Sequence, residues 1–404
     1  MELRLPKGTK DILPEEKILQ DFIVSTIQNV LQKYGFLPFD TPTLEMFDIL
    51  SSKYAGGEEI LKETFKLKDQ GNRELGLRYD LTVPLARFIA MNPQIKFPFK
   101  RYQIGKVFRD GPVSSNRIRE FLQVDADIVG ARTFLADAEV IALTSEIFQL
   151  LDIPVIIRIN NRKILNAILQ ESNILDQSAI LTIDKLDKIG LEGVKKELRQ
   201  KGINEIEQLI RLIQIKDIDK LDSLLTDQEG TNELRNLLNY LKLFDIKDIQ
   251  LDFSLARGLT YYTSTIFEVN TKKMKETIAG GGRYDNMIGM FMQKKQEIPA
   301  VGISFGISRI INLIKSEKKS LIDYYIIPIN TLEKSIIIAS RLRKKGLKID
   351  IDLNKRGISS NLDYANKLGI EKVIIIGEKE LKQNKVKIKN MKTGKETLVE
   401  VSKL

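Results

Sequence analysis

A proline-free stretch, residues 172–246, most constrains how this 404-residue chain can fold. It is rich in Leu, Ile, Lys, Asp and Glu at helical spacing, and it includes LEGVKKELRQKG and NELRNLLNYLKLF. Strand-like runs and glycines occur both before it and after it. A strand-rich fold that stops and then resumes indicates an insertion. We therefore expect a core built from residues 1–171 and 247–318, with residues 172–246 as a helical insertion domain.

The segments before the insertion carry clear local signals. Residues 15–34 have apolar side chains at helical spacing, which predicts an amphipathic helix. Residues 99–109 and 121–130 are strand-like runs joined by a polar loop with glycine and proline, which predicts an antiparallel hairpin. A second helix is expected from about residue 136 to 151.

The last part of the chain, residues 321–404, has a different character. It alternates apolar strand-like runs with helical segments, which predicts a separate small α/β domain. It also holds 18 Lys and Arg against 10 Asp and Glu, so it carries most of the net charge of +10. Such asymmetry favours a polyanionic partner, although a lysine-rich solvated face is the simpler alternative.

The amino acids that are missing restrict the chemistry. The chain contains no cysteine, histidine or tryptophan. This excludes disulfides, Ser-His-Asp triads, imidazole bases and metal sites built on cysteine or histidine. Catalysis would have to use arginine, lysine, carboxylates, amides, hydroxyls and added metal. No apolar run is long enough to cross a bilayer and no secretory signal is visible, so we expect a cytoplasmic protein without membrane contact.

A nucleotide would need an unusual kind of site in this chain. There is no G-x-x-x-x-G-K-[ST] loop, and AGGGRYD does not match the G-x-G-x-x-G fingerprint. Several arginines, however, stand next to glycines or at strand ends: Arg109, Arg117, Arg119, Arg257, Arg283 and Arg309. Guanidinium groups bind phosphate in bidentate fashion, so converging arginines could neutralise a triphosphate. Ordinary surface ion pairing is the alternative for any one of them.

The sequence around these arginines resembles the class II aminoacyl-tRNA synthetases over nearly the whole chain. FDTPTLE at 39–45 is similar to motif 1 of that class, and KVFRDGPVSSNRIREFLQVDADIVG, beginning at Lys106, is similar to motif 2. GISFGISR, ending at Arg309, is similar to motif 3. Three further segments resemble signatures of the histidyl-tRNA synthetases: LRYDLT at 77–82, LARGLTYY at 255–262 and AGGGRYD at 279–285.

The resemblance implies both an architecture and a reaction. The fold would be of the α/β (α+β) class: an antiparallel sheet of six to seven strands flanked by helices, the helical insertion, and a C-terminal α/β anticodon-binding domain at residues 321–404, in a homodimer. The reaction would use ATP and Mg²⁺ to convert L-histidine to histidyl-adenylate and then transfer the histidine to tRNA(His).

The resemblance also implies roles for individual residues. The histidine-binding residues would be Asp80, Thr82, Gln123, Asp127, Tyr261 and Tyr262. Asp80 and Thr82 would hold the α-ammonium group, and Asp127 with Tyr262 would bind the imidazole ring. ATP would be bound by Arg109, Arg117, Phe121 and Arg309, with Phe121 under the adenine. Arg257 and Arg109 would be the catalytic residues at the α-phosphate, and no protein metal ligands are expected.

Some alternatives stay open at this stage. The histidyl-synthetase-like regulatory subunit of ATP phosphoribosyltransferase and a class II enzyme for another amino acid share much of the pattern. Thr260 stands where the family pattern has aspartate, and Asn116 where it has glycine. Asp80 could serve only as a helix N-cap, and the glycines of AGGGRYD only as a turn or bulge.

Overall fold

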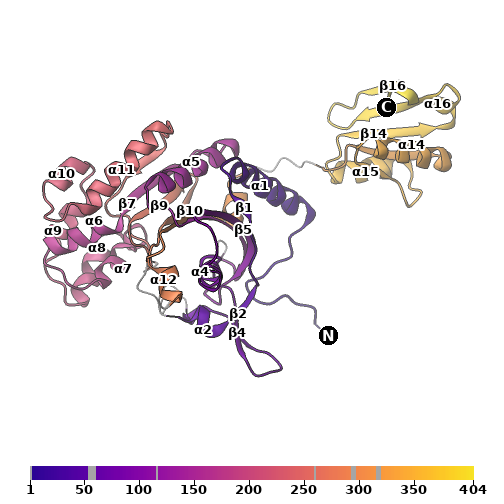
Figure 1. The fold of residues 1–404 in the computed structure, drawn as a ribbon. Coiled ribbons are helices and arrows are strands. Elements are labelled where there is room, and N and C mark those ends of the chain that lie inside the picture. Colours follow the sequence, from indigo (N-terminus) through magenta and orange to yellow (C-terminus); the bar gives the residue numbers. More distant parts are fainter. Residues whose placement is uncertain (1, 53–60, 115–116, 259–260, 293–296, 315–319) are drawn as a thin grey trace. The chain divides into compact units, whose positions relative to one another are not determined.

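The computed structural model describes residues 2–52, 61–114, 117–258, 261–292, 297–314 and 320–404. The chain divides into two compact units, residues 1–11 with 20–314 and residues 12–19 with 315–404. Among the described residues, the first unit contains an eight-stranded and a three-stranded sheet, and the second unit contains a five-stranded sheet (Figure 1). None of the described helices is long and apolar enough to cross a membrane.

The described part of the first unit contains an eight-stranded sheet in the order β1-β5-β6-β11-β10-β9-β7-β8. Its strands are β1 (Leu37–Pro38), β5 (Phe99–Phe108), β6 (Glu120–Val129), β11 (Ala300–Gly306), β10 (Met274–Arg283), β9 (Thr265–Thr271), β7 (Ile156–Asn161) and β8 (Ile249–Leu251). The inner six strands are antiparallel. Each short edge strand is parallel to its neighbour, β1 to β5 and β8 to β7. The sheet therefore has eight strands, and the expected count of six to seven is corrected. With two and three residues, these edge strands are too short for alternation to reveal them.

The predicted hairpin is confirmed and forms the centre of the site. β5 and β6 pair antiparallel over their whole length, from Phe99 opposite Val129 to Phe108 opposite Glu120. Because side chains alternate along a strand, Phe121, Gln123, Asp125 and Asp127 share one face of β6. The buried apolar residues between them point to the opposite face.

Helices cover both faces of this sheet. On one face, the predicted helices appear as α1 (Pro14–Lys33) and α5 (Leu135–Leu150). Gln28 of α1 donates to the Tyr102 hydroxyl at 2.9 Å, and the rings of Phe148 and Phe305 lie 6.1 Å apart. On the other face, α4 (Thr82–Met91) and α12 (Met287–Phe291) pack with Val129 and Ala300. The polar row of β6 shares this second face, which α4 covers only in part (Figure 1).

The remaining elements of the first unit are mostly helical. The proline-free stretch is helical as predicted, in α7 (Ser178–Ile183), α8 (Leu186–Gln200), α9 (Ile206–Ile213), α10 (Ile218–Asp222) and α11 (Glu229–Leu243). It is preceded by α6 (Arg162–Glu171), which Asn161 caps by accepting from the Lys163 amide at 2.8 Å. The smaller elements are β2 (Leu44–Met46), α2 (Phe47–Leu50), β3 (Lys66–Lys68), β4 (Glu74–Leu77) and α13 (Ile307–Ile311).

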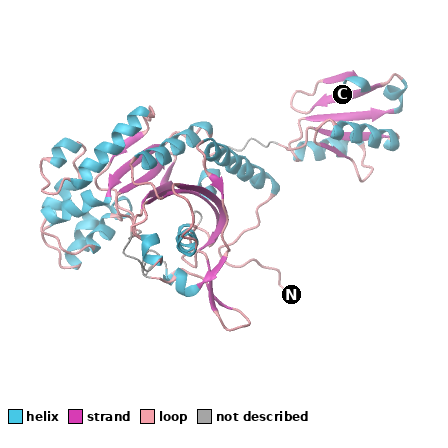
Figure 2. Ribbon diagram, in the orientation of Figure 1, coloured by secondary structure: helices cyan, strands magenta, loops and turns pink. Residues whose placement is uncertain are grey.

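The second unit is the predicted α/β domain (Figure 2). Its sheet order is β13-β12-β14-β15-β16. The strands are β12 (Tyr324–Ile329), β13 (Ile349–Ile351), β14 (Lys372–Gly377), β15 (Lys385–Asn390) and β16 (Glu396–Glu400), and the helices are α14 (Leu332–Lys344), α15 (Ile358–Lys367), α16 (Glu378–Lys382) and η1 (Val401–Lys403). β12, β13 and β14 are parallel, whereas β15 and β16 continue the sheet antiparallel.

Candidate active site

A cavity of ≈ 800 Å³ opens over the polar face of the large sheet. A second cavity of ≈ 340 Å³ adjoins it and shares several of its lining residues. The shared residues are Arg109, Gln123, Arg257, Thr277, Gly280, Ser304 and Arg309. They come from the β5–β6 hairpin, β10, β11, α13 and the segment before β9, so residues far apart in sequence meet in one cleft.

Three of the arginines predicted to bind phosphate, Arg109, Arg257 and Arg309, line this cleft together. Burial, together with the charges of Arg109 and Arg257, lowers the pKa of Arg309. Arg309 donates to the Thr277 carbonyl, a neutral acceptor. Like charges held together in a buried place are unfavourable unless a negative ligand joins them. The cluster is therefore suited to a polyphosphate.

Arg257 is held in place by a carboxylate. Its Nη1 donates to Glu268 Oε1 at 2.6 Å, and Glu268 Oε2 accepts from the Thr277 hydroxyl at 2.8 Å. Burial opposes the charge on Arg257, but Tyr262 and Glu268 outweigh it and raise the pKa of this guanidinium. Arg257 thus remains charged although most of its side chain is buried.

Arg109 is positioned by aromatic rings. Its guanidinium carbon lies 4.4 Å from the ring centre of Tyr79 and 5.1 Å from that of Phe121. Such stacking leaves the edge of the guanidinium for other partners. Arg109 Nε is buried and has no hydrogen-bond partner among the described residues.

The remaining predicted arginines differ in their placement. Arg117 lines the smaller cavity and pairs with Glu63. Arg119 and Arg283, which the resemblance did not assign to the site, are not among the lining residues of either cavity. Arg119 pairs with Asp110 at 3.0 Å. Arg283 is buried and pairs with Asp137, which is fully buried as well.

The glycines of AGGGRYD do not form a turn but allow two side chains, those of Arg257 and Tyr262, to lie close to the backbone of β10. They lie inside β10, where a Cβ on Gly280 would fall 2.4 Å from Arg257 Nη1. A Cβ on Gly282 would fall 2.8 Å from the ring of Tyr262. Side chains at these positions would displace both residues, so the motif makes room for the arginine and the tyrosine.

Asp80 caps α4 and also lines the large cavity. Its Oδ1 accepts from the amides of Thr82 at 3.1 Å and Val83 at 3.0 Å. Burial raises the pKa of Asp80, while the Val83 amide and the Arg109 charge act against this. The capping function is therefore present, and it fixes the carboxylate at the cavity wall.

The tyrosines and Gln123 complete the wall. Tyr261 and Tyr262 line the cavity with ring centres 4.7 Å apart. Burial raises the pKa of both phenols, so both hydroxyls stay protonated and can donate. Gln123 lines the same cavity and donates to Asp125 Oδ1 at 2.8 Å.

Asp127 is placed differently from the other predicted histidine-binding residues. It is 3 % exposed and is absent from the lining of both cavities. Its Oδ1 accepts from the Tyr284 hydroxyl, and its Oδ2 lies 2.7 Å from Arg101 Nη2. Both carboxylate oxygens thus already face protein partners beneath the cavity.

Several residues at the site had not been identified from the sequence. Tyr79, Tyr284 and Ser304 lie inside recognised motifs. Glu268 and Asp184 line the cavity without a motif that marks their role. Burial raises the pKa of Asp184 to about 6. The sequence departures at Asn116 and Thr260 lie outside the described residues. Among the described residues, no group of three or more acidic side chains could hold a metal ion.

Comparison with known proteins agrees across the whole chain. Residues 8–310 match the family described as histidyl-tRNA synthetase, and residues 323–404 match an anticodon-binding domain. The chain is 44% identical to histidine–tRNA ligase 1 of Bacillus cereus, covering 100% of this chain and 99% of the relative. It is 38% identical to histidine–tRNA ligase of Clostridium tetani, covering 96% and 93%.

Solved structures give the same picture. Histidyl-tRNA synthetase from Nostoc sp. PCC 7120 superposes with a TM-score of 0.87 at 30% identity and covers 100% of this chain and 98% of its own. A structure titled as an ATP phosphoribosyltransferase regulatory subunit/histidyl-tRNA synthetase from Bacillus halodurans has a TM-score of 0.77 at 21% identity, covering 93% of this chain and 98% of its own. At that identity the second likeness concerns the fold alone.

Proposed function

Because this chain belongs to the histidyl-tRNA synthetase family and is an aminoacyl-tRNA ligase, we propose that the cleft over the large sheet is where ATP and L-histidine form histidyl-adenylate. The observation that carries this proposal is the cluster of Arg109, Arg257 and Arg309 around one cavity. Their mutual repulsion is relieved when a triphosphate enters. Asp80 and Gln123 line the same cavity and supply polar contacts for an amino acid.

The reaction would proceed by direct displacement. The carboxylate of histidine attacks the α-phosphorus of ATP in line, and pyrophosphate leaves. Arg109 and Arg257 would offset the charge that grows on the α-phosphate oxygens, while Arg309 would hold the leaving pyrophosphate. The attacking carboxylate is already ionised at neutral pH, so this step needs no protein base. The ribose hydroxyl at the 3' end of tRNA then displaces AMP from the adenylate.

The amino acid would be held from both ends. Asp80 and Thr82 are proposed to bind its ammonium group, together with Gln123. Tyr262 is proposed to bind the ring, with Tyr261 packed beside it. Asp127 has the matching family position, and in this structure it supports Arg101 and Tyr284 beneath the ring site.

Magnesium would enter with ATP. The described residues do not assemble a group of acidic side chains for a metal ion. The ATP-bound ion would neutralise phosphate charge alongside the arginines.

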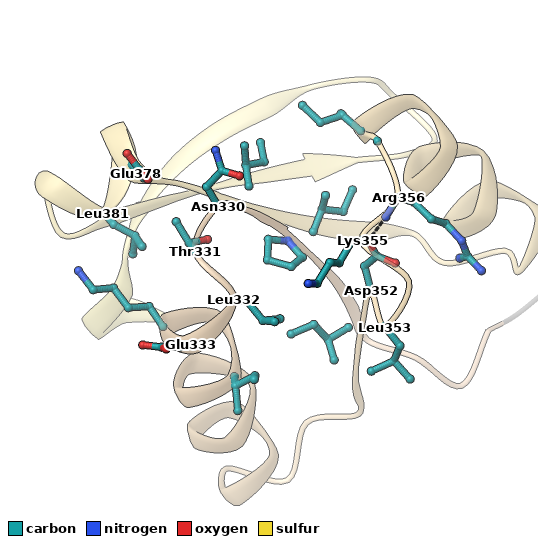
Figure 3. Close-up of a pocket in the computed structure, with 18 of the residues that line it drawn as sticks. Asn330, Thr331, Leu332, Glu333, Asp352, Leu353, Lys355, Arg356, Glu378 and Leu381 are labelled. Carbon is teal, nitrogen blue, oxygen red and sulfur yellow. Dashed lines mark hydrogen bonds between the residues drawn. The ribbon is translucent and has the colours of Figure 1, made fainter.

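The second unit is an anticodon-binding domain, and we propose that it selects tRNA(His). It has a cleft of ≈ 1040 Å³ beyond the carboxyl ends of β12, β13 and β14. Figure 3 shows Asn330, Thr331, Asp352, Lys355 and Arg356 around this cleft. Ligands commonly bind beyond the carboxyl ends of parallel strands, and basic side chains suit phosphate. Binding should therefore weaken steeply as salt rises.

The assembly and location are also proposals. We propose a homodimer, because two apolar side chains of β2 are exposed where the chain resembles motif 1. Leu44, inside that segment, is 49% exposed, and Met46, directly after it, is 42% exposed. Light scattering of the purified chain would test it. We propose the cytoplasm as the location, since that is where tRNA is charged for translation.

The function is tested by ATP–pyrophosphate exchange with the purified chain. Exchange should require L-histidine among the twenty amino acids. Arg257→Ala should lower the exchange rate about 100-fold or more, while tRNA binding stays unchanged, because the proposed contact is to the α-phosphate. Exchange driven by a different amino acid would contradict the proposal. Equal loss of exchange and tRNA binding would contradict the role of Arg257.

A further inference from the structure

The loop between β5 and β6 is held by a glutamate from outside the large sheet. Glu63 lies just before β3 in the sequence, and its backbone carbonyl accepts from the Asp110 amide at 2.7 Å. The side chain of the same residue pairs with Arg117, on the returning arm of the loop. Glu63 therefore bridges the two arms of a loop that is distant from it in sequence.

The backbone of the loop leaves room for this ion pair. Gly111 is buried, and a Cβ at its position would fall 2.7 Å from Glu63 Oε1 and 2.8 Å from Arg117 Nη2. A side chain at this point would have to displace the carboxylate or the guanidinium. The glutamate and the arginine thus pack directly against the loop backbone.

Backbone contacts fix the base of the loop without the side chain of Glu63. The Arg119 amide donates to the Gly8 carbonyl at 2.8 Å, and the Arg109 amide donates to the Arg119 carbonyl at 2.8 Å. These contacts, and the one between the Asp110 amide and the Glu63 carbonyl, would survive a substitution of the Glu63 side chain. The distinct contribution of the carboxylate is therefore its contact with Arg117.

The ion pair lies beside the proposed nucleotide site. Arg117 lines the smaller cavity together with Arg109, and the side chains of Arg117 and Glu63 are 49% and 20% exposed. Burial raises the pKa of Tyr79, while the charge of Arg109 lowers it, that of Glu63 raises it and that of Arg117 lowers it. The pair is therefore within electrostatic reach of the ring that stacks on Arg109.

A half-exposed arginine on a loop has many rotamers, and fixing one of them costs conformational entropy. A guanidinium has five N–H donors, and Glu63 engages Nη2, which leaves the others for a phosphate. We propose that Glu63 is a positioning residue that holds Arg117 at the edge of the cavity for the triphosphate of ATP. This inference rests on the proposed function. Because the arginine is ordered within the fold, less of this cost falls on ATP binding.

The test measures kcat and the KM for ATP in histidine-dependent pyrophosphate exchange. Glu63→Ala should raise the KM for ATP about threefold to tenfold, the range for a partly exposed charged hydrogen bond. The kcat and the KM for histidine should stay within about twofold of wild type, because other residues contact the reacting atoms. Glu63→Gln keeps an acceptor for Arg117 and should raise the KM less. It decides the question if circular dichroism shows that the alanine variant is unfolded.

A double-variant cycle tests whether Glu63 acts through Arg117. Arg117→Ala alone should raise the KM for ATP, and adding Glu63→Ala should raise it no further, since the positioned group is already gone. Gly111→Ala, which places an atom against the ion pair, should raise the KM as well. Glu74→Gln is the matched control. Glu74 pairs with Lys66 at 3.1 Å in the three-stranded sheet, and its loss should leave the KM for ATP unchanged.

The inference is overturned by an unchanged KM for ATP in both Glu63 variants or in Arg117→Ala. A lower KM in the Glu63 variants would also overturn it, because the carboxylate would then compete with the phosphates. Full additivity in the double variant would show that Glu63 acts by another route. Failure of the proposed function looks different, because the wild type would then show no histidine-dependent exchange. Calorimetric titration with ATP would in that case measure the same affinity ratios.

Discussion

Arg257 is bound to Glu268 by a 2.6 Å hydrogen bond. Their side chains are 19% and 14% exposed, so water screens the pair only weakly. Glu268 belongs to β9 and also accepts from Thr277 on β10. Side chains from two strands of the sheet therefore fix the guanidinium. In the proposed reaction this positions Arg257 to offset the negative charge that develops on the α-phosphate oxygens.

Glu268→Gln should lower the kcat of histidine-dependent exchange about tenfold, with a smaller change in the KM for ATP. Glutamine can keep one hydrogen bond but loses the charge that orients Arg257. Steady-state exchange kinetics provide the measurement. Glu396→Gln, which removes a carboxylate from the surface of the second unit, is the matched control and should leave kcat unchanged. An unchanged kcat in Glu268→Gln would mean that Arg257 does not need this partner.

Gly280→Ala should lower kcat about tenfold or more, because the new Cβ would fall 2.4 Å from Arg257 Nη1 and push the guanidinium aside. Gly357→Ala is the matched control. No atom lies within 4 Å of its Cβ position, so its effect on stability should stay within about 0.5 kcal/mol. Exchange kinetics and urea unfolding measure the two effects. Equal kcat values in both variants would show that β10 tolerates a side chain at this point.

Arg309→Gln should make the ligand-free protein more heat-stable, by roughly 1–3 °C. Burial and the charges of Arg109 and Arg257 oppose the charge of Arg309, so its removal relieves repulsion. The same variant should gain less stability than wild type when a non-hydrolysable ATP analogue is added. Differential scanning calorimetry measures both shifts.

The control for that prediction is Arg235→Gln. Arg235 pairs with Asp219 and Asp222 rather than with a cluster of like charges. Its loss should not raise Tm, and the nucleotide-induced gain should equal that of wild type. A lower ligand-free Tm in Arg309→Gln would mean that the arginine serves the fold rather than the ligand.

Much of the fold could be predicted from local sequence patterns. Alternating residues and a turn were enough to predict the hairpin of β5 and β6, and helical spacing predicted α1 and α5. The edge strands β1 and β8 gave no such pattern, because each pairs over only two or three residues with a strand distant in sequence. Pairings of that kind depend on tertiary packing.

A residue could be proposed for the site where its side-chain chemistry and a sequence motif pointed to the same role. It could not be placed where the role depends on a partner that is distant in sequence. Arg109, Arg257 and Arg309 could be proposed as phosphate ligands because guanidinium groups suit that task. Arg283 also stands next to a glycine in the sequence, but in the fold it forms an ion pair with the buried Asp137 of α5. The environments of Asp125 and Asp127 on β6 depend on Arg101. The burial of Arg101 could not be predicted from the local sequence pattern.

Asp125→Asn should become more stable relative to wild type as pH rises from about 5 to 8. Burial raises the pKa of Asp125 from 3.8 to about 7. The folded state therefore holds the proton more tightly than the unfolded state, and stability falls as pH rises between these values. Asparagine carries no titrating proton and escapes this loss. The charged and titratable groups around Asp125 are Arg78, Arg101, Asp127, Tyr262 and Tyr284.

The measurement is the difference in Tm between variant and wild type across this pH range, taken without ligands. Asp252→Asn provides a control that should not vary with pH in this range. Burial raises the pKa of Asp252, but hydrogen bonds from Ser254 and the charge of Arg158 outweigh burial and lower it. The ionised Asp252 therefore stabilises the fold fully at every pH above its unfolded pKa, and the Tm loss of its variant should stay constant from about pH 5 to 8. A Tm difference for Asp125→Asn that stays flat with pH would show that Asp125 is ionised throughout this range.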